Sequence, residues 1–211
     1  MQLVSDIVPH RYAVAPSSVQ VLTPMNGGVL GSRNLNTLLQ RTLNPPKKDS
    51  KEINRYGFSF REGDKVMQLV NDYEKGVFNG ETGTIVRIAQ GRGNSKPRIY
   101  CDFDRLKFVV YELKELDQIA PAYAITIHKS QGSEFPVVII PAHAEHRYML
   151  QRNLIYTAVT RARQLVVVVG SKKALQYAVD RTAGIGTERL TCLKECVREE
   201  YERMTLPQFP S

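Results

Sequence analysis

AITIHKSQGSEF, residues 124–135, begins as a short apolar strand and passes through polar residues and a glycine before the chain becomes apolar again. The stretch that follows, residues 137–140, is entirely apolar, which is typical of a parallel strand covered on both faces. Ligands of such sheets bind at strand ends, where loops bring hydroxyls, N–H groups and cations to phosphates. The pattern therefore predicts an α/β domain with a candidate phosphate-contact loop. An ordinary solvated turn explains the same loop equally well at this point.

The residues that follow this loop continue the α/β pattern. Residues 153–161 suit a helix, residues 165–169 form another apolar strand, and Ser171 can cap a helix that includes Leu175 and Val179. Arg161 and Arg163 come at the C-terminal end of the first of these helices. Two cations there complement the helix dipole, so their position has a structural explanation that needs no ligand.

The N-terminal part predicts another strand, loop and helix. Residues 19–22 form a short β-branched strand, and leucines at helical spacing extend to Leu43 before Pro45 and Pro46 stop the helix. A polar linker over residues 47–52 follows.

Short alternating strands replace this pattern between about residues 58 and 116. The predicted strands are residues 65–70, 83–88, 98–103 and 108–111, with turn signals at 79–80 and 91–94. Strands of this length without intervening helices predict a small antiparallel barrel. We therefore expect one α/β domain over residues 1–45 and 119–182, interrupted by a barrel at 58–116 and followed by a helical tail at 183–211.

Composition limits the choice of partners and location. The chain has 42% hydrophobic residues, no apolar run as long as a membrane span and no signal-peptide pattern, so we expect a soluble, cytoplasmic protein without membrane partners. Its net charge is +8, and the basic excess is concentrated in residues 121–183, which favours a polyanionic partner.

Metal binding is not expected. The cysteines Cys101, Cys192 and Cys196 form no ladder of spacings that would indicate disulfides or zinc. His143 and His146 are close in sequence, but they follow a strand without an evident third ligand. Solvated histidines are the simpler interpretation.

Two stretches together resemble a known family. Residues 126–135 look like motif V, and residues 156–163 look like motif VI, of the RecD-like superfamily 1 DNA helicases, the exodeoxyribonuclease V α-subunit family. Residues 19–40 resemble the segment that opens the second motor domain of that family. The barrel starting near residue 62 resembles the src-homology-3-like insertion of these helicases. The resemblance implies a RecA-like parallel-sheet domain interrupted by this small β-barrel.

The resemblance also implies roles for individual residues. Arg161 matches the arginine that meets the γ-phosphate of ATP, as a catalytic arginine finger. Gly132 and Glu134 match positions on the ATP-binding side, while Thr126 and His128 match positions that contact the DNA backbone. The chain departs from the family at Gly27, where an arginine is frequent; Arg33 is near in sequence but is not assigned to that role.

The nucleotide-gripping motifs are missing from this sequence. Nothing fits the Walker A pattern G-x-x-x-x-G-K-[ST], and no apolar strand ends in paired acidic residues. We therefore expect the C-terminal half of an ATP-dependent 5′→3′ DNA helicase of recombination or repair, inactive without an N-terminal motor domain that completes the site for ATP and Mg²⁺. The alternative is a non-catalytic DNA- or protein-binding module with the same fold. A third, less favoured hypothesis is an interaction domain whose barrel binds peptides.

Overall fold

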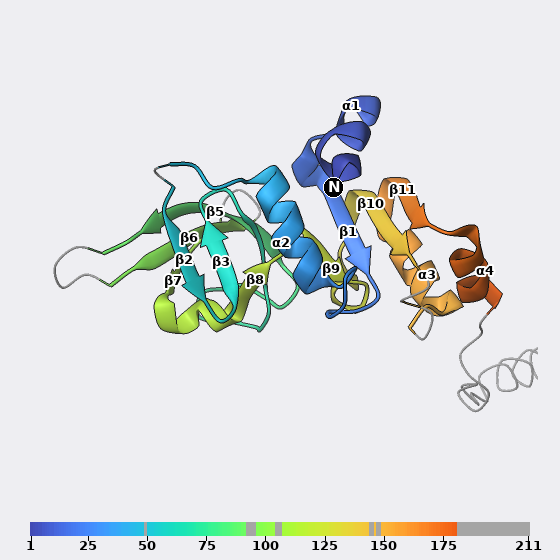
Figure 1. Cartoon of the computed structure of the whole chain (residues 1–211). Helices are drawn as coiled ribbons and strands as arrows, with labels where there is room; N and C mark the ends of the chain where they lie inside the picture. The colour runs from blue at the N-terminus through green and yellow to red at the C-terminus, as the bar shows by residue number, and fades with distance from the viewer. Residues whose placement is uncertain (49, 92–95, 104–106, 144–145, 147–148, 181–211) are drawn as a thin grey trace, which may run out of the picture.

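The computed structural model describes residues 1–48, 50–91, 96–103, 107–143, 146 and 149–180 (Figure 1). The tail for which we expected a helix, residues 183–211, lies outside these ranges. The first elements along the chain are the π-helical turn η1 (Leu3–Ile7), α1 (Val8–Tyr12), the 3₁₀ turn η2 (Pro16–Ser18), β1 (Val19–Thr23) and α2 (Ser32–Leu43). In the described ranges, no helix is long and apolar enough to cross a membrane.

A parallel four-stranded sheet forms the centre of one half of the molecule, with the strand order β11-β10-β1-β9. The other strands are β9 (Ala124–Thr126), β10 (Phe135–Ala142) and β11 (Ala162–Gly170). Leu154 and Ile155 of α3 (Arg152–Val159) and Ala178 of α4 (Lys172–Asp180) pack on one face. Val4, Leu35 and Leu39, from η1 and α2, pack on the other. Both faces of β1 and β10 are covered, as their apolar residues predicted, whereas the edge strand β11 is only partly buried and exposes Val168 and Val169.

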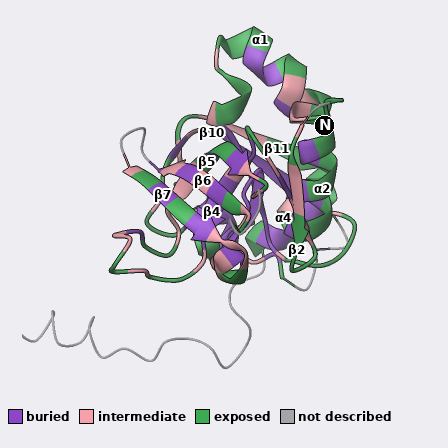
Figure 2. Cartoon of the chain, turned by 90° about the vertical axis from the view of Figure 1, so that its left-hand side faces the viewer, coloured by how far each residue is buried: buried purple, intermediate pink, exposed green. Residues whose placement is uncertain are grey.

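Antiparallel strands form the other half. Their five-stranded sheet has the order β7-β6-β5-β4-β8, and a separate hairpin pairs two more strands. The sheet strands are β4 (Lys65–Gln68), β5 (Thr82–Ala89), β6 (Arg98–Phe103), β7 (Lys107–Glu112) and β8 (Ile119–Pro121), with a 3₁₀ turn η3 (Leu113–Gln118) before β8. Buried and less buried residues alternate along β6 and the second half of β7 (Figure 2). The alternating strands predicted for this region are confirmed.

The hairpin and the end of the barrel differ from the sequence-based prediction. The hairpin consists of β2 (Glu52–Arg55) and β3 (Phe58–Arg61), and its first strand begins where we expected the linker to end. Its burial pattern has no clear alternation, which explains why it escaped detection. β8 pairs with β4, so a barrel strand starts where we placed the second part of the motor domain. The domain boundaries stay a proposal.

A buried carboxylate, that of Asp64, joins the two halves. It accepts hydrogen bonds from Gln40 Nε2 of α2 at 2.6 Å and from Nδ2 of Asn44, the residue after α2, at 2.8 Å. The hydroxyl of Tyr123, between β8 and β9, donates to it at 2.9 Å, and the backbone N–H of Arg61 donates at 2.7 Å. Burial raises the pKa of the Tyr123 hydroxyl, with the charge of Asp64 as a further cause, so it stays a donor. We call this set the Asp64 hub.

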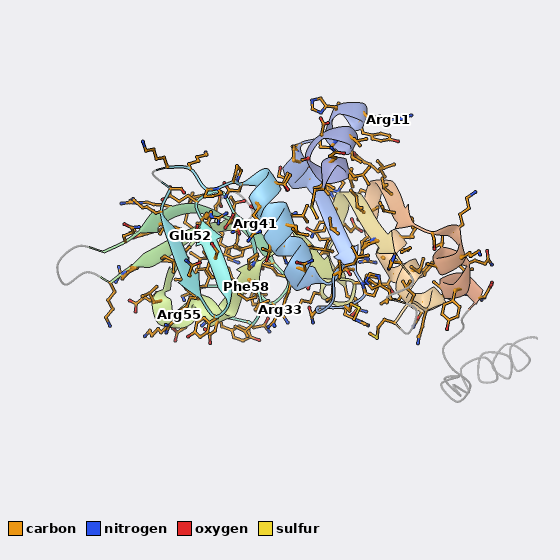
Figure 3. All side chains as sticks on the ribbon, in the orientation of Figure 1. Arg11, Arg33, Arg41, Glu52, Arg55 and Phe58 are labelled. Atoms are coloured by element: carbon orange, nitrogen blue, oxygen red, sulfur yellow. The ribbon has the colours of Figure 1, made fainter. Side chains whose placement is uncertain are left out.

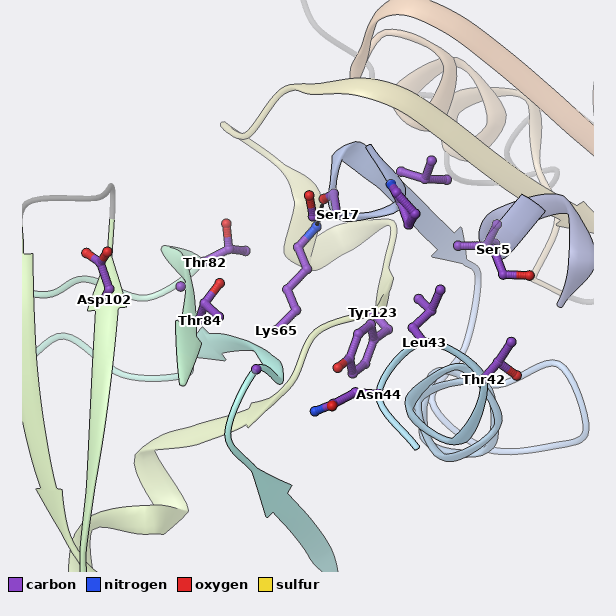
Figure 4. A pocket seen from close by; sticks show the side chains of 15 residues that line it. Ser5, Ser17, Thr42, Leu43, Asn44, Lys65, Thr82, Thr84, Asp102 and Tyr123 are labelled. Carbon is purple, nitrogen blue, oxygen red and sulfur yellow. Dashed lines mark hydrogen bonds between the residues drawn. The ribbon is translucent and has the colours of Figure 1, made fainter. Parts of the chain in front are cut away.

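Beside the hub lies a cavity of about 570 Å³, where the N-terminal segment, α2 and the barrel meet (Figure 4). Lys65 extends into it, and its Nζ donates to the carbonyl oxygen of Ser17 at 3.2 Å. Burial lowers the pKa of Lys65 to about 8. No carboxylate within the described ranges pairs with this ammonium group, so its charge is weakly compensated.

Candidate nucleotide and DNA-binding loops

The loop of residues 127–134, here called the motif loop, joins β9 to β10, which flank β1 in the sheet. It begins as a 3₁₀ turn, η4 (His128–Ser130). The buried hydroxyl of Ser130 donates to the carbonyl oxygen of Ile127 at 2.7 Å, and the Thr126 hydroxyl accepts from the Lys129 N–H at 3.4 Å. These local bonds fix the turn and leave the side chains of His128 and Lys129 exposed.

Gly132 gives the motif loop its second bend. Its φ of +83° lies in the left-handed region that favours glycine, and a Cβ built there would meet no atom within 4 Å. The glycine is therefore required by backbone conformation and not by crowding. The exposed, unshielded backbone leaves room for a ligand to approach.

Arg161 holds the far end of the motif loop. Its Nη1 donates to the carbonyl oxygen of Ser133 at 3.3 Å, and its Nε donates to that of Thr157 in the last turn of α3 at 3.2 Å. Nη2 donates to the hydroxyl of Thr160 at 3.3 Å. All three acceptors are neutral, and no carboxylate in the described part of the chain neutralises this half-buried charge. The bond to Thr157 is the helix-end contact that the structural alternative predicted.

Glu134 and Arg163 form an ion pair next to Arg161. Arg163 Nε lies 2.8 Å from Glu134 Oε2, and the side chains of Arg163 and Glu134 are 67% and 53% exposed. A pair this exposed contributes roughly 0–1 kcal/mol to stability. The fold thus places Arg161 against the loop that contains Gly132 and Glu134, with Arg163 as the partner of Glu134. The roles of these residues toward ATP stay a prediction.

The two residues expected to contact DNA lie at the start of the motif loop. Thr126, the last residue of β9, is 7% exposed and lines a cavity of about 340 Å³. Arg33, Gly27 and Lys129 line the same cavity. A Cβ at Gly27 would meet no atom within 4 Å, so the missing family arginine leaves open space there.

Asn36 of α2 positions this end of the site, and the sequence-based prediction missed it. Its amide donates to the carbonyl oxygen of Ala124 at 2.7 Å, and its side-chain oxygen accepts from the Ala124 N–H at 2.9 Å. β9 is an edge strand, so these two backbone groups have no neighbouring strand to pair with. The sequence signal that could have indicated Asn36 is its position as a polar residue between Leu35 and Leu39, within the apolar stripe of α2.

Within the ranges that the structure describes, metal ligands do not gather. No group of three or more His, Cys, Asp or Glu side chains that could hold an ion occurs among the described residues. His146, which we interpreted as a solvated loop residue, is fully buried. That interpretation is wrong for His146, because its ring packs inside the fold after β10. Its Nδ1 lies 3.3 Å from the carbonyl oxygen of Pro141.

Two family models match the chain. Residues 35–103 match the model described as the ATP-dependent RecD-like DNA helicase SH3 domain. Residues 121–169 match the UvrD-like helicase C-terminal domain. The second match contains the motif loop and Arg161, and the first contains most of the barrel.

Two curated relatives agree with these models. The ATP-dependent RecD2 DNA helicase of Deinococcus radiodurans is 39% identical over 183 residues, which is 87% of this chain and 24% of that protein. The RecBCD enzyme subunit RecD of Mycolicibacterium smegmatis is 32% identical over 130 residues, or 59% of this chain and 21% of that protein. The chain therefore spans a quarter or less of these relatives' length.

Solved structures share the fold. Bacteroides Pif1 bound to single-stranded DNA matches with a TM-score of 0.52 at 19% identity, covering 88% of this chain and 46% of that chain. The expected α/β RecA-like sheet interrupted by an SH3-like barrel is confirmed. Sheet, barrel and matched models define a helicase motor domain. Within that class, the chain belongs to the RecD-like DNA helicases and is a C-terminal region of such a protein.

Proposed function

We propose that this chain is the C-terminal half of an ATP-dependent 5′→3′ DNA helicase that binds single-stranded DNA. In this proposal the N-terminal motor domain of the same longer protein contains the Walker motifs, and the chain alone does not hydrolyse ATP. The printed names of the relatives, an ATP-dependent DNA helicase and a RecBCD enzyme subunit, support the reaction class. The missing Walker patterns support the need for the other domain.

The position of Arg161 is the observation that carries the proposal. Its guanidinium lies against the motif loop, and no described carboxylate neutralises its charge. ATP bound with Mg²⁺ supplies a phosphoryl group on which negative charge shifts during transfer. Arg161 acts as the arginine finger that stabilises this charge, because its planar fork can replace the weak bonds to Ser133 and Thr160 with bonds to phosphate oxygens. Gly132 and Glu134 form the nucleotide side of the loop.

Thr126 and His128 contact the DNA backbone in this proposal. The Thr126 hydroxyl uses a lone pair for the Lys129 N–H and keeps its own hydrogen for a phosphate oxygen. The exposed His128 ring and the Lys129 ammonium group lie on the same turn. Contacts of this kind position a strand without reading its sequence.

Arg161→Ala in the longer helicase tests the arginine finger. If the charge acts mainly in the transition state, kcat for ATP falls on the order of a hundredfold or more while KM changes little. Arg161→Lys rescues poorly, because an ammonium group lacks the planar fork. Arg152→Ala is the control and leaves kcat within a few-fold, since this exposed arginine of α3 donates to the carbonyl oxygen of Val179 at 2.7 Å and does not contact the motif loop. ATPase rate and melting temperature are measured on each variant.

Near-normal turnover of Arg161→Ala with a lowered melting temperature would leave only the helix-end role, worth roughly 0.3–1 kcal/mol. The finger assignment would then be abandoned. Steady ATP hydrolysis by the chain alone, unaffected by Arg161→Ala, would contradict the dependence on an N-terminal domain.

A further inference from the structure

Three adjoining cavities, here together called the groove, extend from the motif loop to the far side of α2. The cavity of about 340 Å³ at Thr126, a second of about 280 Å³ and a third of about 600 Å³ are all lined by both Arg33 and Phe58. The three spaces therefore adjoin one another at the N-terminal end of α2. We call the third space, between α2 and the β2–β3 hairpin, the hairpin cleft.

The α2 wall of the hairpin cleft carries a row of exposed side chains. Arg33, Thr37 and Arg41 are spaced four residues apart, so they lie on one face of the helix. The two arginines are about 12 Å apart along the axis, from a rise of about 1.5 Å per residue. Neither has a carboxylate partner within the described ranges. Figure 3 shows both on α2, with Arg55 and Phe58 on the neighbouring hairpin.

The hairpin wall adds a third arginine and an aromatic tip. The Arg55 guanidinium lies 5.0 Å from the ring centroid of Tyr56, whose residue is 49% exposed. Tyr56 has a φ of +51° and Gly57 a φ of +76°, the backbone of a tight hairpin turn. The turn therefore presents a tyrosine ring at its tip, although the left-handed conformation is uncommon for tyrosine.

Negative charge is nearly absent from the groove. Glu52 is the one acidic residue that lines any of the three spaces, as far as the structure describes the chain. It is bound by Arg61, with Nε to Oε2 at 2.6 Å, and this hydrogen bond lowers the pKa of Glu52. The cations Arg33, Arg41, Arg55 and Lys129 are left to attract a polyanion.

We propose that the hairpin cleft is a second binding site for single-stranded DNA, beside the cavity at the motif loop, in which Arg33 and Arg41 bind phosphates and Tyr56 stacks on a base. This inference rests on the proposed function only in taking single-stranded DNA as the ligand. Arginine rows bind any polyanion, but an exposed ring beside them adds affinity for a nucleic acid, because every base has a face on which it stacks. An acidic protein segment would gain nothing comparable from Tyr56.

Fluorescence anisotropy of the whole chain with an oligothymidine of roughly 15 nucleotides tests the arginines. Arg33→Gln with Arg41→Gln weakens binding and flattens the plot of log affinity against log salt. The slope changes by about 0.7 for each phosphate that the variant no longer binds. The control removes two equally exposed cations elsewhere, through Arg11→Gln with Lys172→Gln, and changes neither quantity appreciably.

Tyr56→Asn tests stacking. Asparagine adopts positive φ more readily than tyrosine, so the turn is retained. Binding weakens by roughly fivefold or more while the salt slope is unchanged, because the variant no longer stacks on a base but still binds every phosphate. Tyr12→Asn is the matched control, since Tyr12 is also 49% exposed and lies on α1.

The outcomes separate this inference from the proposed function. If His128→Ala weakens binding and the cleft variants do not, the cleft inference is wrong and the motif-loop contact stands. If the cleft variants weaken binding and His128→Ala does not, the cleft site stands and the motif-loop contact fails. Weaker binding by the arginine variant with unchanged binding by Tyr56→Asn would indicate a general polyanion site and overturn strand binding.

Discussion

Helix α2 presents polar side chains in two neighbouring rows, here called its two sides, and the two are used differently. Toward β9 and the barrel, Asn36 and Gln40 are buried and bind backbone groups and the Asp64 carboxylate. Toward the hairpin cleft, Arg33 and Arg41 are exposed and have no described carboxylate partner. The same helix therefore fixes the motif strand and the barrel on one side and offers charge to solvent on the other.

The difference shows how polar residues can be interpreted in a fold. A buried amide without partners costs free energy, so Asn36 and Gln40 persist there because their partners satisfy them. An exposed arginine costs little and stabilises little, so the fold gives no reason for a row of them. Substitutions of Asn36 and Gln40 should therefore lower the free energy of unfolding, and substitutions of Arg33 and Arg41 should not. For DNA affinity we expect the reverse.

Asp64→Ala is the strongest way to break this comparison. It removes the acceptor of the buried Gln40 and Tyr123 donors, of the half-buried Asn44 amide and of the Arg61 N–H, although Gln40 and Asn44 keep their bonds to the carbonyl oxygens of Ser59 and Glu62. Each buried donor left without an acceptor costs about 1–3 kcal/mol. We expect a decrease of at least about 3 kcal/mol in the free energy of unfolding, measured by urea denaturation. If this variant does not fold, Asp64→Asn, which keeps one acceptor oxygen, provides a measurable intermediate decrease. A change near zero in both variants would show that the hub does not hold the halves together.

Asn36→Ala should have the next largest effect. It removes both bonds to the edge of β9 and leaves the Ala124 N–H and carbonyl buried, so we expect the free energy of unfolding to fall by about 1–3 kcal/mol. Asn34→Ala is the control, because Asn34 is exposed and donates only to the carbonyl oxygen of Val29, at 2.7 Å. Its unfolding free energy should change by about 0.5 kcal/mol or less. Equal decreases in the free energy of unfolding of the two variants would show that the buried and the exposed side of α2 do not differ in their contribution to stability.

Lys65 sharpens the comparison, because it is a charge near the hub without a carboxylate partner. Burial lowers its pKa from 10.5 to about 8, so the unfolded chain binds this proton more tightly than the folded chain. The contribution of Lys65 to stability therefore rises as pH increases from about 8 to about 10.5, and its charged form is destabilising below that window. The difference between wild type and Lys65→Met, followed by thermal unfolding across this pH range, should show that rise. A pH-independent difference would contradict the effect of burial.

Patterns with a strong local cause could be predicted from the sequence. The apolar runs at β10 and β11, the short strands β5–β7 and the cap at Ser171 all form where they were expected. Gly132 adopts a positive φ of +83°, a conformation for which glycine is the usual residue in a turn. The hairpin strand β2 was missed because its residues carry no alternating pattern.

The sequence by itself determined the order of motifs, the interruption of the sheet by a barrel and the residue types of the motif loop, because periodicity and turn chemistry act between near neighbours in the chain. Only the tertiary structure decided that Arg161 lies against Ser133, that Asn36 closes the edge of β9 and that Asp64 collects donors from α2, β3 and the segment before β9. The hairpin cleft likewise exists only because α2 packs beside the hairpin. These contacts join residues that are far apart in the chain. The local sequence pattern around a polar residue does not specify which distant group will form its hydrogen bonds.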